Sequence, residues 1–190
     1  APNEVFDKFN VNAVYAASIG QVHEAWKDGH KLAVKLQYPG VADSIHSDIN
    51  LVKPLVLRFI GVKEKDVKQY FEEFEERLNE ECDYEMELKN GTEIAAATQH
   101  IPNLIIPKYY KELSAKKILT MEWIEAKPLQ YFLDNETNQD KKNQIGQALL
   151  DFLHSSIHEH QRFHADPHPG NFLVTADNKL VVLDFGCVKT

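Results

Sequence analysis

The stretch FHADPHPGNFLVTADNKLVVLDFG, residues 163–186, constrains the fold of this chain more than any other part of the sequence. Its two short apolar runs, FLVT and KLVVLD, flank a turn at residues 176–178, a pattern typical of two β-strands in a hairpin. Asn171 directly precedes the first run, and Asp184 ends the second. A hairpin of this length can bring Asn171 and Asp184 close together.

The side chains at these positions predict a site for a divalent cation and a phosphate. An Asn carbonyl and a carboxylate that converge form the oxygen-rich environment that Mg²⁺ prefers, and phosphoryl-transfer enzymes use such sites. Asp166, which lies five residues before Asn171, would then face the terminal phosphate as a base or as an organiser of phosphate and water. The alternative is a structural loop, because Pro, Gly, Asn and Asp favour turns in any case.

The N-terminal part has two further features that suit a nucleotide. The small-residue loop AASIGQVH, which begins at Ala16, lies between two strand-like segments and would let backbone N–H groups approach phosphate oxygens. Asp28-Gly29 predicts a tight turn into the strand KLAVKLQ. Lys35 lies in the middle of that strand, where a lysine is most often solvent-facing. It becomes relevant to phosphate binding if a carboxylate orients it.

Composition limits the class of protein. Of the 190 residues 43% are hydrophobic, which indicates a globular chain and not a disordered one. The net charge of −8 argues against a general nucleic-acid-binding protein, and residues 64–87 alone carry eleven acidic and three basic residues. No apolar run reaches about 18 residues, so no membrane-spanning helix is expected.

Helices are predicted between these features. Apolar residues at helical spacing predict a helix over residues 42–60, with Pro54 as a candidate kink or break. A long acidic helix is predicted over residues 64–97, with Gly91 as a candidate interruption. A third, amphipathic helix is predicted over residues 138–160, with Ile157 among its buried residues.

Five motifs together resemble a known family. They are YAASIGQVHEA, AVKLQYPGV, ECDYEMEL, HADPHPGNF and LDFG. In this combination the chain is similar to the UbiB family of atypical protein-kinase-like ATPases, which is linked to coenzyme Q synthesis. The resemblance extends from about Phe9 to Lys189, and the AASIGQVH and ADPHPGN motifs are specific to that family.

The resemblance implies a role for each matched residue. Lys35 is similar to the strand lysine that holds the α- and β-phosphates, with Glu87 as its carboxylate partner on a helix. Asp166 matches the catalytic-loop aspartate, while Asn171 and Asp184 match the two metal ligands. The other implied positions are the Ala-rich nucleotide loop at Ala16, Ala17, Ser18, Ile19 and Gly20, the family's E-x-D pair Glu81 and Asp83, the adenine-binding hinge at Glu122, Trp123 and Ile124, and a structural signature at Gln37, Tyr38 and Pro39.

The implied fold is α+β, protein-kinase-like and two-lobed. A small antiparallel sheet with inserted long helices would form the N-lobe over residues 1–126. A truncated, mostly helical C-lobe with the catalytic loop would cover residues 127–190. The family also carries an N-terminal K-x-G-Q motif that residues 1–12 do not supply, and kinase-like folds continue past the D-F-G motif. The chain is therefore expected to be a fragment, or an incomplete family member, truncated at both ends.

The implied function is Mg²⁺-dependent binding of ATP or ADP with ATPase or atypical kinase activity, linked to isoprenoid-quinone lipid metabolism. The expected partners are the nucleotide and, from the family, a lipid or isoprenoid-quinone precursor and a membrane surface; nucleic acid is not expected. The expected location is the cytoplasm or the membrane periphery, or the mitochondrial matrix or plastid of a eukaryote.

Two alternatives remain open. A small-molecule phosphotransferase of the aminoglycoside or choline kinase type shares the H-x-D-x-x-P-x-N pattern that begins at His164, but it lacks the AASIGQVH and E-x-D combination. A non-catalytic nucleotide-sensing scaffold would bind metal and nucleotide without turnover.

Overall fold

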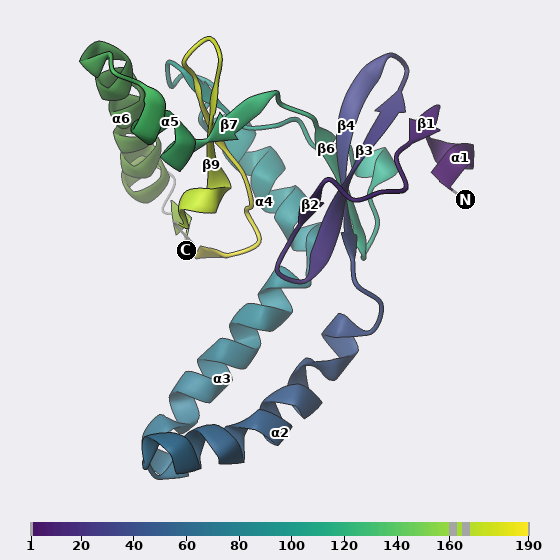
Figure 1. The fold of residues 1–190 in the computed structure, drawn as a ribbon, viewed down its shortest axis with the longest axis vertical. Helices are drawn as coiled ribbons and strands as arrows, with labels where there is room; N and C mark the ends of the chain where they lie inside the picture. Colours follow the sequence, from purple (N-terminus) through teal and green to yellow (C-terminus); the bar gives the residue numbers. More distant parts are fainter. Residues whose placement is uncertain (1, 160–162, 165–167, 190) are drawn as a thin grey trace.

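The structure is a computed structural model that describes residues 2–159, 163–164 and 168–189. It combines helices with largely antiparallel sheets, which confirms the expected α+β class (Figure 1). In chain order the elements are α1 (Pro2–Val5), β1 (Lys8–Phe9), β2 (Tyr15–Ala16), β3 (Gly20–Lys27), β4 (His30–Gln37), α2 (Val41–Ile60), α3 (Glu64–Glu81), α4 (Tyr84–Ala97), β5 (Leu104–Ile105), the 3-10 turn η1 (Lys111–Leu113), β6 (Ile118–Glu122), β7 (Ala126–Pro128), α5 (Leu129–Asn135), α6 (Gln139–His154), the π-helical turn η2 (Ser155–Glu159), β8 (Phe163–His164), the 3-10 turn η3 (Pro169–Asn171), β9 (Phe172–Thr175), β10 (Leu180–Val182) and β11 (Val188–Lys189).

The first sheet is antiparallel and has the order β1-β3-β4-β6, with β2 also paired to β3. Its centre is the β3–β4 hairpin, which turns at Asp28 and Gly29 with φ of 51° and 78°. Two positive φ angles at the tip of a two-residue turn match the twist of the strands, so the predicted hairpin is confirmed. Leu32 and Val34 point to one side of β4 and are 1% exposed, as the alternation in KLAVKLQ predicts.

The second sheet has the order β5-β10-β9-β7. The predicted hairpin is present as β9 and β10, and Asn178 adopts a φ of 62° in its turn. Strand β5, which precedes residue 126, pairs in parallel with β10, so this sheet takes strands from both sides of that residue. The division of the chain at residue 126 therefore stays a prediction.

Helices α2 and α3 form an antiparallel hairpin that projects from the two sheets (Figure 1). Helix α2 runs unbroken through Pro54, so the helix does not split there. The predicted single helix over residues 64–97 is wrong, because the chain breaks at Cys82 and Asp83 between α3 and α4. The Asp83 side chain accepts a hydrogen bond from the backbone N–H of Met86 and starts a new helix by capping it.

Gly91 does not interrupt a helix but lies within α4. A Cβ atom at this position would lie 2.3 Å from Cε2 of Tyr109, so the glycine lets the helix approach the tyrosine ring. A glycine is needed here because the helix backbone packs closely against the Tyr109 ring, and not because the helix ends.

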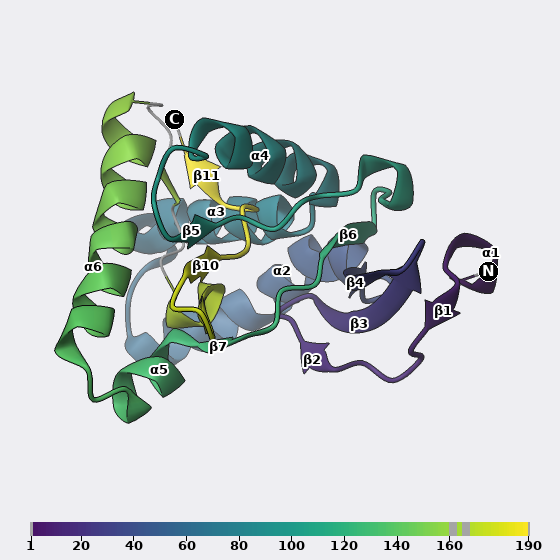
Figure 2. The same ribbon diagram turned by 90° about the horizontal axis from the view of Figure 1, so that it is seen from above.

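The largest hydrophobic core joins α6 to the second sheet (Figure 2). Phe152 of α6 and Leu180 of β10 are completely buried in it. The helix predicted over residues 138–160 ends as α6 at His154 and continues as the π-helical turn η2. Ile157 lies in that turn and is 48% exposed, so its predicted burial is wrong. Within the described part of the chain, no helix combines the length and the apolar content needed to cross a membrane.

Candidate functional site

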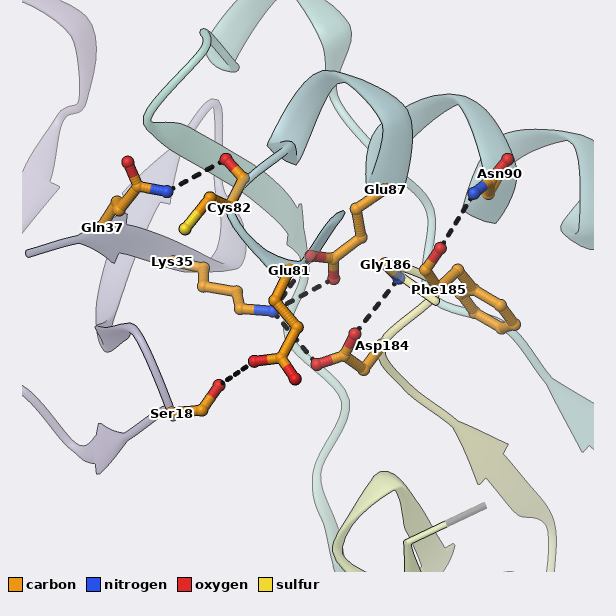
Figure 3. Close-up of polar contacts among 10 residues, drawn as sticks. All are labelled: Ser18, Lys35, Gln37, Glu81, Cys82, Glu87, Asn90, Asp184, Phe185 and Gly186. Carbon is orange, nitrogen blue, oxygen red and sulfur yellow. Dashed lines mark hydrogen bonds and ion pairs between the residues drawn. The ribbon is translucent and has the colours of Figure 1, made fainter. Parts of the chain in front are cut away.

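Lys35 connects the first sheet to α4 and to the end of the second sheet. Its ammonium nitrogen lies 3.0 Å from Oε2 and 3.3 Å from Oε1 of Glu87, and 3.2 Å from Oδ2 of Asp184 (Figure 3). The side chains of Lys35 and Glu87 are 11% and 2% exposed, whereas that of Asp184 is 40% exposed. The structure thus brings together three residues that the sequence places far apart, and leaves one carboxylate open to solvent.

The charges of this cluster depend on one another. Burial would lower the pKa of the Lys35 ammonium, but attraction to Glu87 and Asp184 outweighs this effect and raises the pKa, so Lys35 stays positively charged. For Glu87 burial is the larger effect, and it raises the pKa to about 7 against the opposing attraction of Lys35. Removal of Lys35 would leave the Glu87 carboxyl group buried without its cation, whereas removal of Glu87 would leave Lys35 paired with Asp184 alone.

The backbone explains why Lys35 points inward. Along β4, Leu32 and Val34 face the apolar core beside Phe6, so the alternate residues Ala33 and Lys35 face the opposite side, where α4 lies. Glu87 is in the first turn of α4, which the cap at Asp83 starts at Tyr84. A charged first-turn carboxylate is also favoured by the helix dipole.

Asp184 lies at the exit of β10 in a constrained conformation. Its φ is 61°, a left-handed value that few residues other than glycine adopt. Its Oδ1 accepts a hydrogen bond from the backbone N–H of Gly186 at 3.2 Å, and Asn90 of α4 donates to the carbonyl of Phe185 at 3.0 Å. Phe185 itself is completely buried. The segment Asp184-Phe185-Gly186 is therefore held against α4 by packing and by polar contacts.

Asn171 lies beside this segment. The backbone N–H of Leu183 donates to the carbonyl of Asn171 at 2.8 Å, which extends the β9–β10 ladder to the residue before Asp184. The predicted closeness of Asn171 and the end of the second strand is confirmed at the level of the backbone. Asp166 lies outside the described residues. The strand before it, β8, is described and pairs with β11, with His164 opposite Val188.

The small-residue loop forms a tight turn between β2 and β3. Ala16 pairs with Gln21, and the N–H of Ala17 donates to the carbonyl of Gly20. The buried side chain of Ile19 packs in the core beside α4. A Cβ atom at Gly20 would lie 2.3 Å from the carbonyl oxygen of Leu36, so only glycine fits this close approach of β3 and β4.

This turn leaves two backbone donors without a protein partner. In the described part of the chain, the N–H groups of Ser18 and Ile19 have no hydrogen-bond partner. The Ser18 hydroxyl donates to Oε2 of Glu81 at 2.7 Å, so the turn is fastened to the end of α3. Of the E-x-D pair, Glu81 contacts the loop and Asp83 caps α4.

The predicted hinge follows β6. The N–H of Glu122 donates to the carbonyl of Lys108, and the N–H of Trp123 donates to the carbonyl of Lys31. The N–H of Ile124 has no such partner among the described residues. Of the three hinge positions, Ile124 is therefore the one whose backbone donor is available to a ligand.

Three residues around the cluster were not predicted as parts of the site. Tyr84 is buried beneath Lys35, whose ammonium lies 5.2 Å from the ring centroid. Asn90 holds Phe185, and Tyr109 packs on Gly91. The spacing of Glu87 and Asn90, one turn apart on one helix face, is a signal that could have identified Asn90. Gln37, expected to be structural, donates to the carbonyl of Cys82 at 3.0 Å and fixes the break between α3 and α4.

Comparison with known proteins gives a consistent result. The family description "ABC1 atypical kinase-like domain" matches residues 1–190. An uncharacterized chloroplastic aarF domain-containing protein kinase of Arabidopsis thaliana is 36% identical over 193 residues, covering 97% of this chain and 26% of that protein. The mitochondrial atypical kinase COQ8B of Danio rerio is 36% identical over 177 residues, covering 92% of this chain and 28% of that protein. The chain thus spans about a quarter of the length of these relatives.

A solved structure shows the same fold. Rv3197 of Mycobacterium tuberculosis, in its complex with erythromycin, has a TM-score of 0.79 and 33% sequence identity to this chain. The match covers 97% of this chain and 47% of Rv3197. The kinase-like fold expected from the motifs is confirmed, and so is the resemblance on which it was based. The chain therefore belongs to the family of ABC1 atypical kinase-like domains.

Proposed function

We propose that this chain binds ATP or ADP together with Mg²⁺ and supports ATP hydrolysis or phosphoryl transfer. The observation that carries the proposal is the position of the Lys35 ammonium between the buried carboxylate of Glu87 and the partly exposed carboxylate of Asp184. A lysine fixed in this way can hold the phosphates of a nucleotide, and a carboxylate beside it can hold the metal ion that accompanies them.

The donor groups beside Lys35 fit Mg²⁺. Asp184 offers a carboxylate that is 40% exposed. Asn171 lies close by, because its backbone carbonyl accepts a hydrogen bond from the N–H of Leu183. Both supply oxygen ligands, which this small, hard cation prefers. When bound, Mg²⁺ would neutralise charge on the phosphate oxygens.

The other residues have complementary roles in this proposal. The N–H groups of Ser18 and Ile19 would bind phosphate oxygens, and the N–H of Ile124 would bind the adenine edge. Asp166 would accept a proton from the nucleophile or orient it. Because the relatives include a mitochondrial atypical kinase and a chloroplastic aarF domain-containing protein kinase, we further propose a place in isoprenoid-quinone lipid metabolism at the surface of an organellar membrane.

Thermal unfolding with nucleotide tests the binding part of the proposal. The chain is melted with ADP or ATP, with and without Mg²⁺, in parallel with Asp184→Asn and with the control Asp177→Asn. Asp177 is an exposed carboxylate in the β9–β10 turn, at the opposite end of the same hairpin. Nucleotide at a hundredfold excess over Kd should stabilise the folded chain by about 2.7 kcal/mol. The Mg²⁺-dependent part of the shift should be lost in Asp184→Asn and kept in Asp177→Asn.

A second measurement separates binding from turnover. Phosphate release is followed for the chain and for Asp166→Asn, which should bind nucleotide but release phosphate more slowly by about a hundredfold or more. Binding without any phosphate release would favour a nucleotide-sensing scaffold. Absence of a thermal shift with every nucleotide would overturn the proposal.

A further inference from the structure

Two histidines at the C-terminal end of α6 lie side by side, outside the candidate site (Figure 2). His154 is the last residue of α6, and His158 lies in the π-helical turn η2 that follows. Their ring centroids are 4.7 Å apart, with 42° between the ring planes. Both side chains are exposed, and within the described part of the chain neither forms a hydrogen bond or an ion pair. The ring nitrogens of this pair are therefore accessible to a ligand.

The π-helical turn brings the two rings into register. One turn of an α-helix takes about 3.6 residues, so side chains four positions apart do not lie directly above one another. A π-helical turn is wider, because its hydrogen bonds join residues five apart, and four residues come closer to one full turn. The inner side of η2 is packed against the protein, where Ser155 and Ser156 are 2% and 4% exposed. Such short π-helical segments are frequent at functional sites.

Two imidazoles at this spacing suit a transition-metal ion. Imidazole nitrogen is a good ligand for Zn²⁺, Cu²⁺ and Ni²⁺. In the H-E-x-x-H motif two histidines four positions apart on one helix face bind Zn²⁺, and a glutamate between them acts as the base. The stretch from His154 to His158 reads HSSIH, which has the spacing without the glutamate. The pattern therefore indicates metal binding and not metalloprotease chemistry.

The separation of the rings agrees with a shared ion. At a Zn–N distance of about 2.0–2.1 Å, two nitrogens bound to one tetrahedral ion lie about 3.3 Å apart. Rings with centroids 4.7 Å apart can each present a nitrogen at that separation. No third His, Cys, Asp or Glu joins the pair among the described residues, so the protein supplies two ligands there.

We propose that His154 and His158 form a binding site for a transition-metal ion at the junction of α6 and η2. Water would complete the coordination, and two protein ligands should bind more weakly than the four of a structural zinc site. A bound ion would link the last residue of α6 to the fourth residue of η2 and so fix the π-helical turn. This inference does not rest on the proposed nucleotide site, whose oxygen ligands select Mg²⁺.

The competing explanation is that the two imidazoles only stack on each other at the surface. Metal preference separates the two cases. A site built from imidazoles should prefer Cu²⁺ to Ni²⁺ and Ni²⁺ to Co²⁺, and it should not take Mg²⁺, which requires oxygen ligands. Another exposed histidine, His46, has neighbours on both ring nitrogens, at 2.8 Å from Glu75 and 2.9 Å from Asn50. It is therefore a useful control for metal binding by surface histidines in general.

The test is isothermal titration of the 190-residue chain, prepared without a histidine tag, with Cu²⁺, Ni²⁺, Zn²⁺ and Mg²⁺. The variants are His154→Ala and His158→Ala, each made separately. The controls are His46→Ala and His30→Ala, which removes a single exposed histidine at the start of β4. Melting temperatures without metal show whether each variant keeps the fold. The electron paramagnetic resonance spectrum of bound Cu²⁺ reports directly whether nitrogen ligands hold the ion.

The expected result is one Cu²⁺, Ni²⁺ or Zn²⁺ ion per chain at a site that loses affinity in both variants. Each single variant should bind at least about tenfold more weakly, since losing even the hydrogen-bond partner of a ligand costs that much. Both controls should bind like the original chain, and Mg²⁺ should not distinguish the variants from it. Equal affinities in the His154 and His158 variants and in the controls would overturn the proposal. So would an original chain that binds none of the three transition metals.

Discussion

The ammonium nitrogen of Lys35 and Oε2 of Glu87 lie 3.0 Å apart, and both side chains are almost excluded from solvent. The segment between these residues contains the entire α2–α3 hairpin. The ion pair therefore fastens β4 to α4 directly beside the point where the hairpin leaves and rejoins the fold. This relationship makes the pair a structural element as well as a part of the candidate site, and its energetics can be measured.

Replacement of Lys35 alone should destabilise the fold strongly. Lys35→Met leaves the carboxylate of Glu87 buried without its cation, so the free energy of unfolding should fall by about 3 kcal/mol. The double variant Lys35→Met with Glu87→Leu should recover most of this loss, because neither charge remains. Urea unfolding of the original chain, Lys35→Met, Glu87→Leu and the double variant measures the coupling. As a control, Lys117→Met removes an exposed lysine 3.9 Å from Asp43 and should cost no more than about 0.5 kcal/mol. A double variant less stable than Lys35→Met would contradict the prediction.

Stability should depend on pH through Glu87. Its pKa is raised to about 7 in the folded chain, mainly by burial, whereas an unfolded glutamate has a pKa of about 4.5. Between these values the folded state binds more protons than the unfolded state, so the free energy of unfolding should fall as pH rises from about 5 to 7. Glu87→Gln cannot lose this proton, and its stability should fall less over the same range. Unfolding titrations of both proteins at several pH values provide the comparison, and parallel curves would exclude a titrating Glu87.

Two helical glycines should respond to alanine in opposite directions. At Gly91 in α4 a Cβ atom would lie 2.3 Å from the ring of Tyr109, so Gly91→Ala should destabilise the chain by about 1–3 kcal/mol. At Gly146 in α6 nothing lies within 4 Å of the added carbon, so Gly146→Ala should stabilise it by about 0.5–1 kcal/mol through helix propensity. Thermal unfolding of both variants tests this pair. A loss of stability at Gly146, or none at Gly91, would show that the packing around α4 or α6 differs from that described.

Asp83 should stabilise α4 through the hydrogen bond that its side chain accepts and not through its negative charge. Its side chain accepts the N–H of Met86 at 2.9 Å, and asparagine caps helices about as well as aspartate. Asp83→Asn should therefore keep the stability of the chain, while Asp83→Ala should lower it by about 1 kcal/mol. Denaturant unfolding measures both effects. Equal losses in the two variants would point to a requirement for the negative charge at this position.

Much of the site could be predicted because its residues lie in local patterns. The turn at Asp28-Gly29 and the alternation of Leu32 and Val34 define the β3–β4 hairpin, and the turn at residues 176–178 defines β9 and β10. Such hairpins depend on near neighbours in the chain, so turn chemistry and period-two alternation are sufficient to identify them. The motifs then gave Lys35, Glu87 and Asp184 as a set, and the structure brings these three side chains together.

The features that were missed depend on contacts between distant segments. From its strand alone Lys35 is expected to lie on the surface, and it is buried because α4 packs over it. The break between α3 and α4 at Cys82 and Asp83 could not be predicted, because helical periodicity continues across it. The break is stabilised from a distant strand, where Gln37 of β4 donates to the carbonyl of Cys82. Gly91 was expected to interrupt the helix but lies inside α4, since its role depends on Tyr109, eighteen positions away along the chain. Propensity describes single segments, and tertiary contacts override it at these points.

The break between α3 and α4 makes the hairpin a lever. Its short arm is the end of α3, where Glu81 is bonded to Ser18 in the small-residue loop, and its fulcrum is the Cys82 carbonyl held by Gln37. Its long arm is the rest of α3, a helix whose 18 residues together extend over about 27 Å. A rotation about the fulcrum that moves the Ser18 loop by a fraction of an ångström displaces the distal turn by several times as much. Conversely, a load on that turn reaches the loop reduced in amplitude and multiplied in force.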